Sequence, residues 1–170
     1  MNESKSILVL TTGGTIDKLY FDALSQYQIA ESTVTKLLAV ARVTHGHQVE
    51  EVLRKDSLDL TEADRARVIE HVSRASNSRI VITHGTDTMT LTARALSVIP
   101  DKTIVLTGAL APARFSESDA AFNLGMAFAI AQTASPGIYI TMNGSVFRGD
   151  EVEKDRERGA FVLTPRKQEL

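Results

Sequence analysis

The sequence predicts a doubly wound α/β domain, with a mostly parallel sheet in the flavodoxin-like strand order 2-1-3-4-5. Short runs of β-branched and aliphatic residues alternate with longer segments of helical periodicity along the 170 residues. Runs that are apolar on both faces are typical of strands buried inside a parallel sheet. Alternation of strand and helix places helices on both faces of such a sheet. A chain of this length supports one core, so residues 1–170 are expected to form a single domain.

Each predicted element rests on a local signal. Strands are expected at residues 6–12, 48–53, 79–83, 103–107 and 137–142, and helices at 32–42, 61–75, 88–99 and 118–131. Thr61 and Asp64 have the spacing of a capping box at the start of the second helix. Pro100 ends the third helix, because proline cannot continue a helix.

The pattern is less regular in two places. Asn143 and Gly144 are typical of a tight hairpin turn, so a C-terminal hairpin or edge strand is expected, with residues 161–163 as the candidate strand. Residues 13–31 begin with a glycine pair and have no clear periodicity. Because long loops in compact domains are usually functional, this segment is expected to act as a mobile lid.

Composition excludes several classes of function. Acidic residues outnumber basic ones by 21 to 19 without a basic stripe, so nucleic acid is not an expected partner. The absence of cysteine excludes disulfides, thiolate metal sites and a cysteine nucleophile. The apolar run at residues 7–10 is too short for a signal peptide or a membrane helix, which favours the cytoplasm and no membrane association. His45 and His47 have no third ligand at a suitable spacing, so no metal is expected.

Polar motifs follow three of the predicted strands directly. They lie at residues 11–16, 55–59 and 83–89. Ligands of open α/β sheets bind beyond the carboxyl ends of the strands, at the point where the strand order reverses. Because the first strand is expected to lie between the second and the third, the three motifs should meet in one crevice.

The side chains of this crevice favour a hydroxyl nucleophile. Gly13 and Gly14 permit a sharp turn that leaves main-chain N–H groups free to face an anion. Thr15 and Thr86 are the candidate nucleophiles, and a hydroxyl needs a positioned base at neutral pH. No Ser–His–Asp spacing is evident. Asp87, together with a lysine from elsewhere in the chain, is the simplest base, since a desolvated lysine can lose its proton.

The same motifs resemble those of a known family. Residues 12–16 (Thr-Gly-Gly-Thr-Ile) and 82–89 (Ile-Thr-His-Gly-Thr-Asp-Thr-Met) are similar to the two signature segments of bacterial L-asparaginases. Shorter blocks resemble further parts of that family in the same order, and they lie at residues 56–60, 107–110, 122–124, 142–143 and 151–154. The likeness covers nearly the whole chain, and the two signatures together are highly specific.

The resemblance implies a role for each matching residue. Thr15 corresponds to the threonine that accepts the acyl group, and Tyr27 corresponds to the tyrosine that orients it. Thr86, Asp87 and Lys154 correspond to the second catalytic cluster. Ser57 corresponds to the serine that binds the α-carboxylate of the substrate. The substrate-binding residues implied in this way are Gly14, Asp56, Ser57, Gly85, Thr86 and Asp87.

The chain also departs from the family pattern. Leu58 stands where a glutamine usually helps to bind the substrate in the periplasmic type. Family members normally have a C-terminal domain that closes the neighbouring subunit's site and supplies an acid, so this chain resembles a short form. The apolar helix at residues 118–131 is then expected to be buried in a symmetric homo-oligomer, a dimer or a tetramer.

Each candidate residue also has an ordinary structural interpretation. Taken alone, Thr86 and Asp87 are typical of a helix N-cap. Lys154 lies in a charged run, and such runs usually form a solvated face. Ser57 has an alternative as a residue that precedes a helix, and Tyr27 as the anchor of a loop.

Together, the motifs and the resemblance predict an L-asparaginase that hydrolyses L-asparagine to L-aspartate and ammonia without a cofactor. Glutaminase activity is the alternative within the same class, because one methylene in a pocket changes binding by only about 1–3 kcal/mol. A non-catalytic amino-acid-binding module is the alternative of another class. A binding module has no need of two nucleophile candidates, which favours the enzyme. Which threonine bonds to the substrate is left open.

Overall fold

The computed structural model describes residues 6–164, and its central feature is a six-stranded sheet in the order β4-β1-β5-β6-β7-β8. The strands are β1 (Ile7–Gly13), β4 (His47–Lys55), β5 (Arg79–Thr83), β6 (Thr103–Thr107), β7 (Gly137–Met142) and β8 (Ser145–Arg148). The first five are parallel, and β8 pairs antiparallel with β7. Numbered among themselves, the parallel strands have the predicted order 2-1-3-4-5, which is confirmed.

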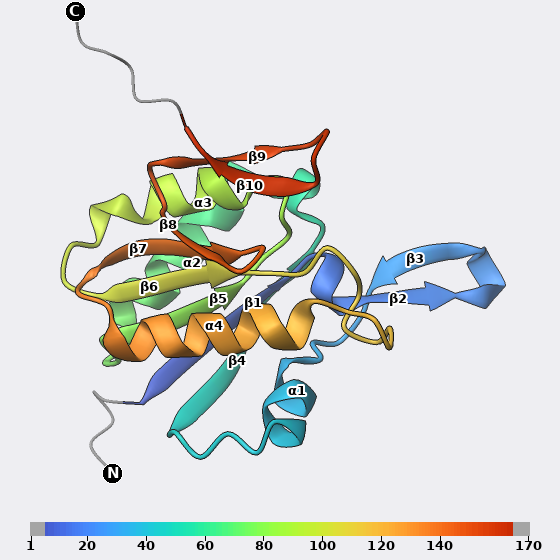
Figure 1. Cartoon of the computed structure of the whole chain (residues 1–170), viewed down its shortest axis with the longest axis horizontal. Helices are drawn as coiled ribbons and strands as arrows, with labels where there is room; N and C mark the ends of the chain where they lie inside the picture. The colour runs from blue at the N-terminus through green and yellow to red at the C-terminus, as the bar shows by residue number, and fades with distance from the viewer. Residues whose placement is uncertain (1–5, 165–170) are drawn as a thin grey trace, which may run out of the picture.

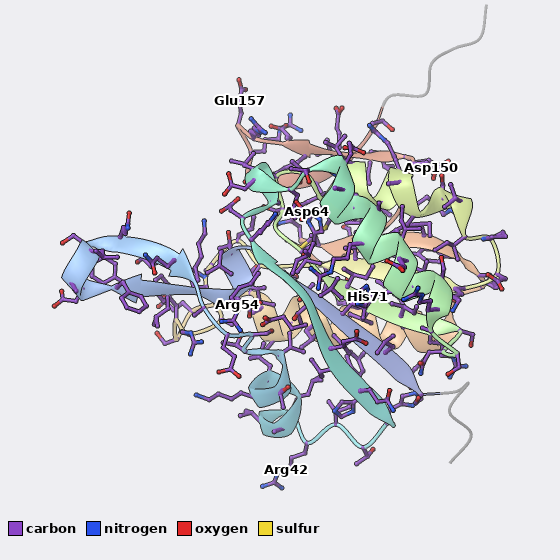
Figure 2. The ribbon with its side chains drawn as sticks, turned by 180° about the vertical axis from the view of Figure 1, so that it is seen from behind. Arg42, Arg54, Asp64, His71, Asp150 and Glu157 are labelled. Carbon is purple, nitrogen blue, oxygen red and sulfur yellow. The ribbon has the colours of Figure 1, made fainter. Side chains whose placement is uncertain are left out.

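Helices cover both faces of the sheet, as predicted for a doubly wound domain. They are α1 (Val34–Val40), α2 (Glu62–Arg74), α3 (Met89–Ala95) and α4 (Ala120–Thr133). Figure 1 shows α1 and α4 in front of the sheet, with α2 behind it. Figure 2 shows the opposite side, where Asp64 and His71 mark the course of α2 across the sheet. Among residues 6–164, every helix is too short or too polar to be a membrane-spanning segment.

Alternating strand residues divide the core into two layers. Leu8, Leu10 and Ile82 belong to a cluster with α2 and α3, whereas Val9 and Val81 belong to a cluster with α1 and α4. Successive residues of a strand point to opposite faces, so both faces of a central strand must be apolar. This explains why these strands appear in the sequence as continuous apolar runs rather than as alternating ones.

Local signals set the ends of the helices. Thr61 and Asp64 form the predicted capping box, in which Thr61 Oγ1 accepts from the Asp64 N–H and Asp64 accepts from the Thr61 N–H. The third helix is shorter than expected, because α3 ends at Ala95 and a 3-10 turn, η5 (Leu96–Val98), follows before Pro100.

The prediction of an irregular loop over residues 13–31 is wrong. The segment contains a 3-10 turn, η2 (Thr15–Asp17), and then an antiparallel hairpin of β2 (Lys18–Phe21) and β3 (Gln26–Ile29). The hairpin extends away from the main sheet, as both figures show. Most of its side chains are exposed on either face, so no apolar alternation marks the strands in the sequence.

The predicted C-terminal hairpin is present, and a second one follows it. Asn143 and Gly144 turn β7 into β8 with φ values of 54° and 73°, as a tight turn with two positive φ angles requires. Residues 161–163 do form a strand, but this strand, β10 (Ala160–Leu163), pairs with β9 (Val152–Asp155) in a separate sheet and not with the main sheet. Val152 and Phe161 anchor this second hairpin, because both are buried in the cluster with α2 and α3.

A row of threonines crosses the sheet, and on each strand the threonine directly follows a buried apolar residue of the core. Thr11, Thr83, Thr107 and Thr141 are in register on β1, β5, β6 and β7, and all four are buried. Thr107 Oγ1 donates to the Thr141 carbonyl at 2.9 Å. The hydroxyls of the other three have no partner within residues 6–164. A buried hydroxyl without a partner costs free energy that an isosteric methyl group does not.

Thr141→Val is therefore expected to raise the free energy of unfolding by about 1 kcal/mol, because it removes an unpaired buried hydroxyl. Thr107→Val is the matched control, because it removes a bonded hydroxyl from the same row and should lower that free energy by about 1 kcal/mol. Urea unfolding at neutral pH measures both. Equal losses in the two variants would contradict the assignment of the unpaired hydroxyl.

Candidate active site

Three chain segments meet at the carboxyl ends of β1, β4 and β5, and glycine allows their close approach. A Cβ atom on Gly14 would lie 2.4 Å from the Gly85 nitrogen, and one on Gly85 would lie 2.6 Å from Ser57 Oγ. Neither gap can hold a side chain, so Gly14 packs on the backbone of Gly85, and Gly85 packs on the side chain of Ser57. Thr15 follows Gly14 directly and Thr86 follows Gly85, which brings the predicted residues of all three motifs to one place.

The first segment owes its shape to the glycine pair. Gly13 and Gly14 have φ values of 95° and 88°, in the region that favours glycine. They follow an irregularity in the pairing of β1 with β4, and the Gly14 N–H donates to the Lys55 carbonyl at 3.1 Å. Thr15 then begins the η2 turn with its side chain half-buried. Thr15 thus lies directly beyond the end of β1 and is partly accessible.

The second segment, the loop after β5, is joined to the C-terminal β9–β10 hairpin by Lys154. Lys154 Nζ donates to Thr86 Oγ1 at 2.7 Å and to Asp87 Oδ1 at 2.8 Å. Lys154 shares a face of β9 with the buried Val152, because residues two apart in a strand point the same way. Its side chain is only 16% exposed, whereas the neighbouring Glu153 is exposed. Lys154 therefore points inward and does not belong to the solvated face of the charged run.

The third segment holds a buried hydroxyl without a partner. Ser57 begins the turn η4 (Ser57–Asp59), is 1% exposed, and its Oγ has no hydrogen-bond partner within residues 6–164. Thr88 Oγ1 donates to the Ser57 carbonyl at 2.7 Å, which ties this turn to the loop after β5. A buried hydroxyl without a partner costs free energy, so an additional acceptor at this position would stabilise it.

Asp56 is already engaged on both carboxylate oxygens. Oδ1 accepts from the Leu58 N–H at 3.1 Å, and Oδ2 pairs with Lys18 Nζ at 2.9 Å. Burial acts to raise the pKa of Asp56, but the hydrogen bonds from Lys18 and Leu58 outweigh it, so the pKa is lowered. Asp56 thus holds the Ser57 turn against the start of the β2–β3 hairpin, a contact that the motif alone does not indicate.

The hairpin is also held at its base by a buried carboxylate. Asp17 Oδ1 accepts from the Thr33 N–H at 2.8 Å, from Thr33 Oγ1 at 3.1 Å and from Ser32 Oγ at 3.2 Å. Burial raises the pKa of Asp17, and these hydrogen bonds act in the opposite direction. Sequence reasoning missed Asp17 and Lys18, because only the folded hairpin brings them to their partners.

The structure does not bring Tyr27 to Thr15. Tyr27 lies on β3 and is half exposed, with its ring 5.3 Å from that of Tyr20 and 6.2 Å from that of Phe115. Within residues 6–164 it forms no hydrogen bond with Thr15. Its contacts here are those of an aromatic cluster that includes the outer hairpin.

His84 is the buried titratable group of the site. It is fully buried, Nδ1 lies 2.7 Å from the Gly85 carbonyl, and Nε2 lies 2.8 Å from Thr92 Oγ1. Burial lowers the pKa of His84 to about 4, against the effect of the Gly85 hydrogen bond. The imidazole is therefore neutral at physiological pH. His47, in contrast, lies outside the site, and its Nδ1 is 2.8 Å from the His45 carbonyl.

The low pKa of His84 predicts a loss of stability in mild acid. The unfolded chain binds a proton near pH 6.5 and the folded chain only near pH 4, so stability is complete above pH 6.5 and falls as the pH drops toward 4. The loss should approach about 1.4 kcal/mol per pH unit across this window. Urea unfolding at several pH values measures it. His84→Gln is the control, because it should remove this part of the pH dependence; an unchanged slope would contradict the assignment.

No group of three or more His, Cys, Asp or Glu side chains within residues 6–164 is arranged to hold a metal ion. Around the Lys154 contact, the site presents threonine and serine hydroxyls, the Asp87 carboxylate, the Lys154 ammonium group and main-chain amides. Such a set can bind a small zwitterion and transfer an acyl group through a hydroxyl.

Comparisons with known proteins agree with this description. A family model described as "Asparaginase, N-terminal" matches residues 6–163. The chain is 32% identical over 160 residues to an L-asparaginase of Thermococcus kodakarensis, covering 90% of this chain and 48% of that protein. It is also 32% identical over 165 residues to a glutaminase-asparaginase of Pseudomonas fluorescens, covering 88% of this chain and 45% of that protein.

A solved structure shows the same likeness in three dimensions. The probable cytoplasmic L-asparaginase from Campylobacter jejuni matches with a TM-score of 0.78 at 26% sequence identity, covering 88% of this chain and 50% of that one. The chain spans about half the length of these relatives.

Proposed function

Because the chain belongs to the asparaginase family, we propose that it is an amidohydrolase that cleaves L-asparagine to L-aspartate and ammonia. The observation that carries the proposal is the contact of Lys154 with Thr86 and Asp87, beside the Gly14–Gly85 packing. A lysine held against a threonine hydroxyl and a carboxylate is a proton-transfer unit. Two segments far apart in the sequence form this unit, and the Gly14 turn packs beside it, which supports a chemical rather than a local structural role.

In the proposed reaction, Thr15 Oγ attacks the carbon of the side-chain amide. Main-chain N–H groups beside the glycine pair and in the loop after β5 stabilise the oxyanion, and each such donor contributes about 3–4 kcal/mol in other acyl-transfer sites. The proton of Thr15 passes to the amide nitrogen, which leaves as ammonia. Water then attacks the ester, one of its protons is relayed through Thr86 and Lys154 to the departing Thr15 oxygen, and aspartate is released with Thr15 restored.

Substrate recognition in this proposal uses the polar groups that the protein leaves available. Ser57 Oγ is buried without a partner, so it donates to the α-carboxylate of the substrate. Asp87 uses Oδ1 for Lys154, and its side chain remains one-third exposed. Its other oxygen accepts from the α-ammonium group. Together these contacts select an amino acid over a simple amide.

Glutamine hydrolysis is the second candidate, since one relative is named a glutaminase-asparaginase. The test is ammonia release by the purified full chain from L-asparagine and from L-glutamine. Release from asparagine supports the proposal, and faster release from glutamine moves the assignment to glutaminase. No release from either amide, with saturable aspartate binding by calorimetry, would establish a binding module instead.

We also propose that the protein works as a homo-oligomer through the outer face of α4. This helix has no charged residue, and Phe122 is 63% exposed on it. A Cβ atom on Gly125 would meet nothing within 4 Å, so a second backbone can approach closely. Large apolar faces seldom stay exposed on soluble monomers.

Phe122→Lys is therefore expected to dissociate a dimer or tetramer that the unmodified chain forms at micromolar concentration, as measured by sedimentation velocity. Val98→Lys is the control, because Val98 is 70% exposed away from α4 and should leave the oligomer intact. A chain that sediments as a monomer before any substitution would exclude the proposal.

A cytoplasmic location belongs to the same proposal. The Campylobacter jejuni protein is named as probable cytoplasmic, and the structures share their fold. Cell fractionation of the source organism with an antibody to the chain tests this location.

A further inference from the structure

His84 contacts the Gly85–Thr86 peptide, which lies in the loop after β5 beside the candidate active site. It is the first residue after β5, and its N–H donates to the Thr107 carbonyl at 2.8 Å. Its own carbonyl lies against Gly108, where a Cβ atom would be only 2.3 Å away. The backbone of His84 is therefore held in place by the end of β6, and this fixes the position from which its imidazole ring extends.

The hydrogen bonds of the ring define one tautomer. The Gly85 carbonyl can only accept, so Nδ1 carries the hydrogen and donates at 2.7 Å. Nε2 is then a bare acceptor, and the Thr92 hydroxyl donates to it at 2.8 Å. Thr92 is 1% exposed on α3, so water does not replace this donor. A chain of two directed hydrogen bonds thus runs from α3 through the imidazole to the Gly85 carbonyl.

The direction of the Gly85 carbonyl determines the direction of the next amide. A trans peptide is planar, so the Thr86 N–H points opposite to the Gly85 C=O. Among residues 6–164 the Thr86 N–H donates to no protein acceptor, although Thr86 itself is 5% exposed. His84 holds the carbonyl on the inner side, and the amide hydrogen consequently faces away from the imidazole.

We propose that His84 and Thr92 form a positioning pair, which sets the Gly85–Thr86 peptide so that the Thr86 amide and hydroxyl face the substrate together. This inference rests on the proposed amidohydrolase function. Neither residue touches the reacting atoms. Packing alone does not require this arrangement, because an apolar side chain of similar size would fill the same volume without a directed donor.

The pair predicts a separation of kcat from KM. Thr92→Val keeps the shape and removes the hydroxyl, which leaves Nε2 unpaired and frees the ring to turn. We expect kcat to fall about ten- to a hundredfold, because small misplacements of reacting groups cost that much. KM for asparagine should change less than about threefold, because Ser57 and Asp87 are untouched. Thr92→Ser restores the hydroxyl and should recover most of kcat.

Nitrogen-15 NMR tests the pair independently of activity. The unmodified full chain should show the Nδ1–H tautomer of His84, and the Thr86 amide resonance should shift in Thr92→Val but not in Thr92→Ser. An Nε2–H tautomer in the unmodified chain overturns the inference without any variant. A folded Thr92→Val protein with unchanged kcat or an unshifted Thr86 amide also overturns it.

The same measurements separate this inference from the proposed function. An unmodified chain that releases no ammonia from asparagine or glutamine contradicts the function. The tautomer and the Thr86 amide shift still decide the positioning of the peptide in that case.

Discussion

Thr15→Ala and Thr86→Ala are each expected to lower the turnover of asparagine by about 10²–10⁴, because each removes a positioned nucleophile or proton-transfer group. Both hydroxyls lie at the ends of strands, beside the Gly14–Gly85 packing, and outside the two apolar clusters. The free energy of unfolding should therefore change little. Steady-state ammonia release and urea unfolding of the same samples measure the two quantities.

Thr35→Ala is the control for these variants. Thr35 is an exposed threonine on α1, outside the three segments that form the site, so its loss should leave turnover unchanged. Trapping of a covalent acyl-enzyme by rapid acid quench then distinguishes the two threonines. If Thr15 is the nucleophile, no acyl-enzyme forms in Thr15→Ala. Near-normal ammonia release from either alanine variant would remove that threonine from the proposed mechanism.

Lys154→Met is expected to lower turnover by at least about a hundredfold, because the proposed proton-transfer unit then loses its nitrogen. Lys154 donates to both Thr86 and Asp87, so the substitution removes the hydrogen-bond donor that these two side chains share. The cost in stability should be modest, because Asp87 remains in contact with water. Kinetics at saturating asparagine, with thermal unfolding in parallel, separate the two effects.

The neighbouring charges provide matched controls for Lys154. Glu153 and Arg156 are exposed in the same charged run, so Glu153→Lys and Arg156→Glu should leave turnover within about threefold, as is usual for surface positions. Similar mild losses in all three variants would show that Lys154 contributes only to the general charge of this edge.

Local patterns predicted much of the fold because their interactions are local. The continuous apolar runs of the central strands reflect burial on both faces, and the order of strand and helix followed from them. Thr61 and Asp64 are three residues apart and cap α2 by themselves. Asn143 and Gly144 produce the tight turn by their own backbone preferences. Each of these features leaves a pattern that is visible within a short stretch of the sequence.

The hairpin at residues 18–29 had no such signal. Its strands are mainly exposed on both faces, so no apolar alternation marks them. The pairing of Tyr20 with Tyr27 and the anchoring of Asp17 by Thr33 hold it together, and both need the folded chain. The same limit explains Tyr27, whose expected place beside Thr15 followed from the resemblance and not from any local interaction.

The sequence by itself determined the fold class, the strand order and which motifs lie at the strand ends, because burial and backbone preferences are visible in short stretches. Only the tertiary structure decided which side chains of those motifs meet. Lys154 lies 68 residues from Thr86 and within a charged run, yet β9 directs it inward because Val152 anchors the strand in the core. The unpaired Ser57 hydroxyl and the His84–Thr92 hydrogen bond likewise depend on packing between segments. Contacts between residues far apart in the sequence produce no periodic pattern from which they could be predicted.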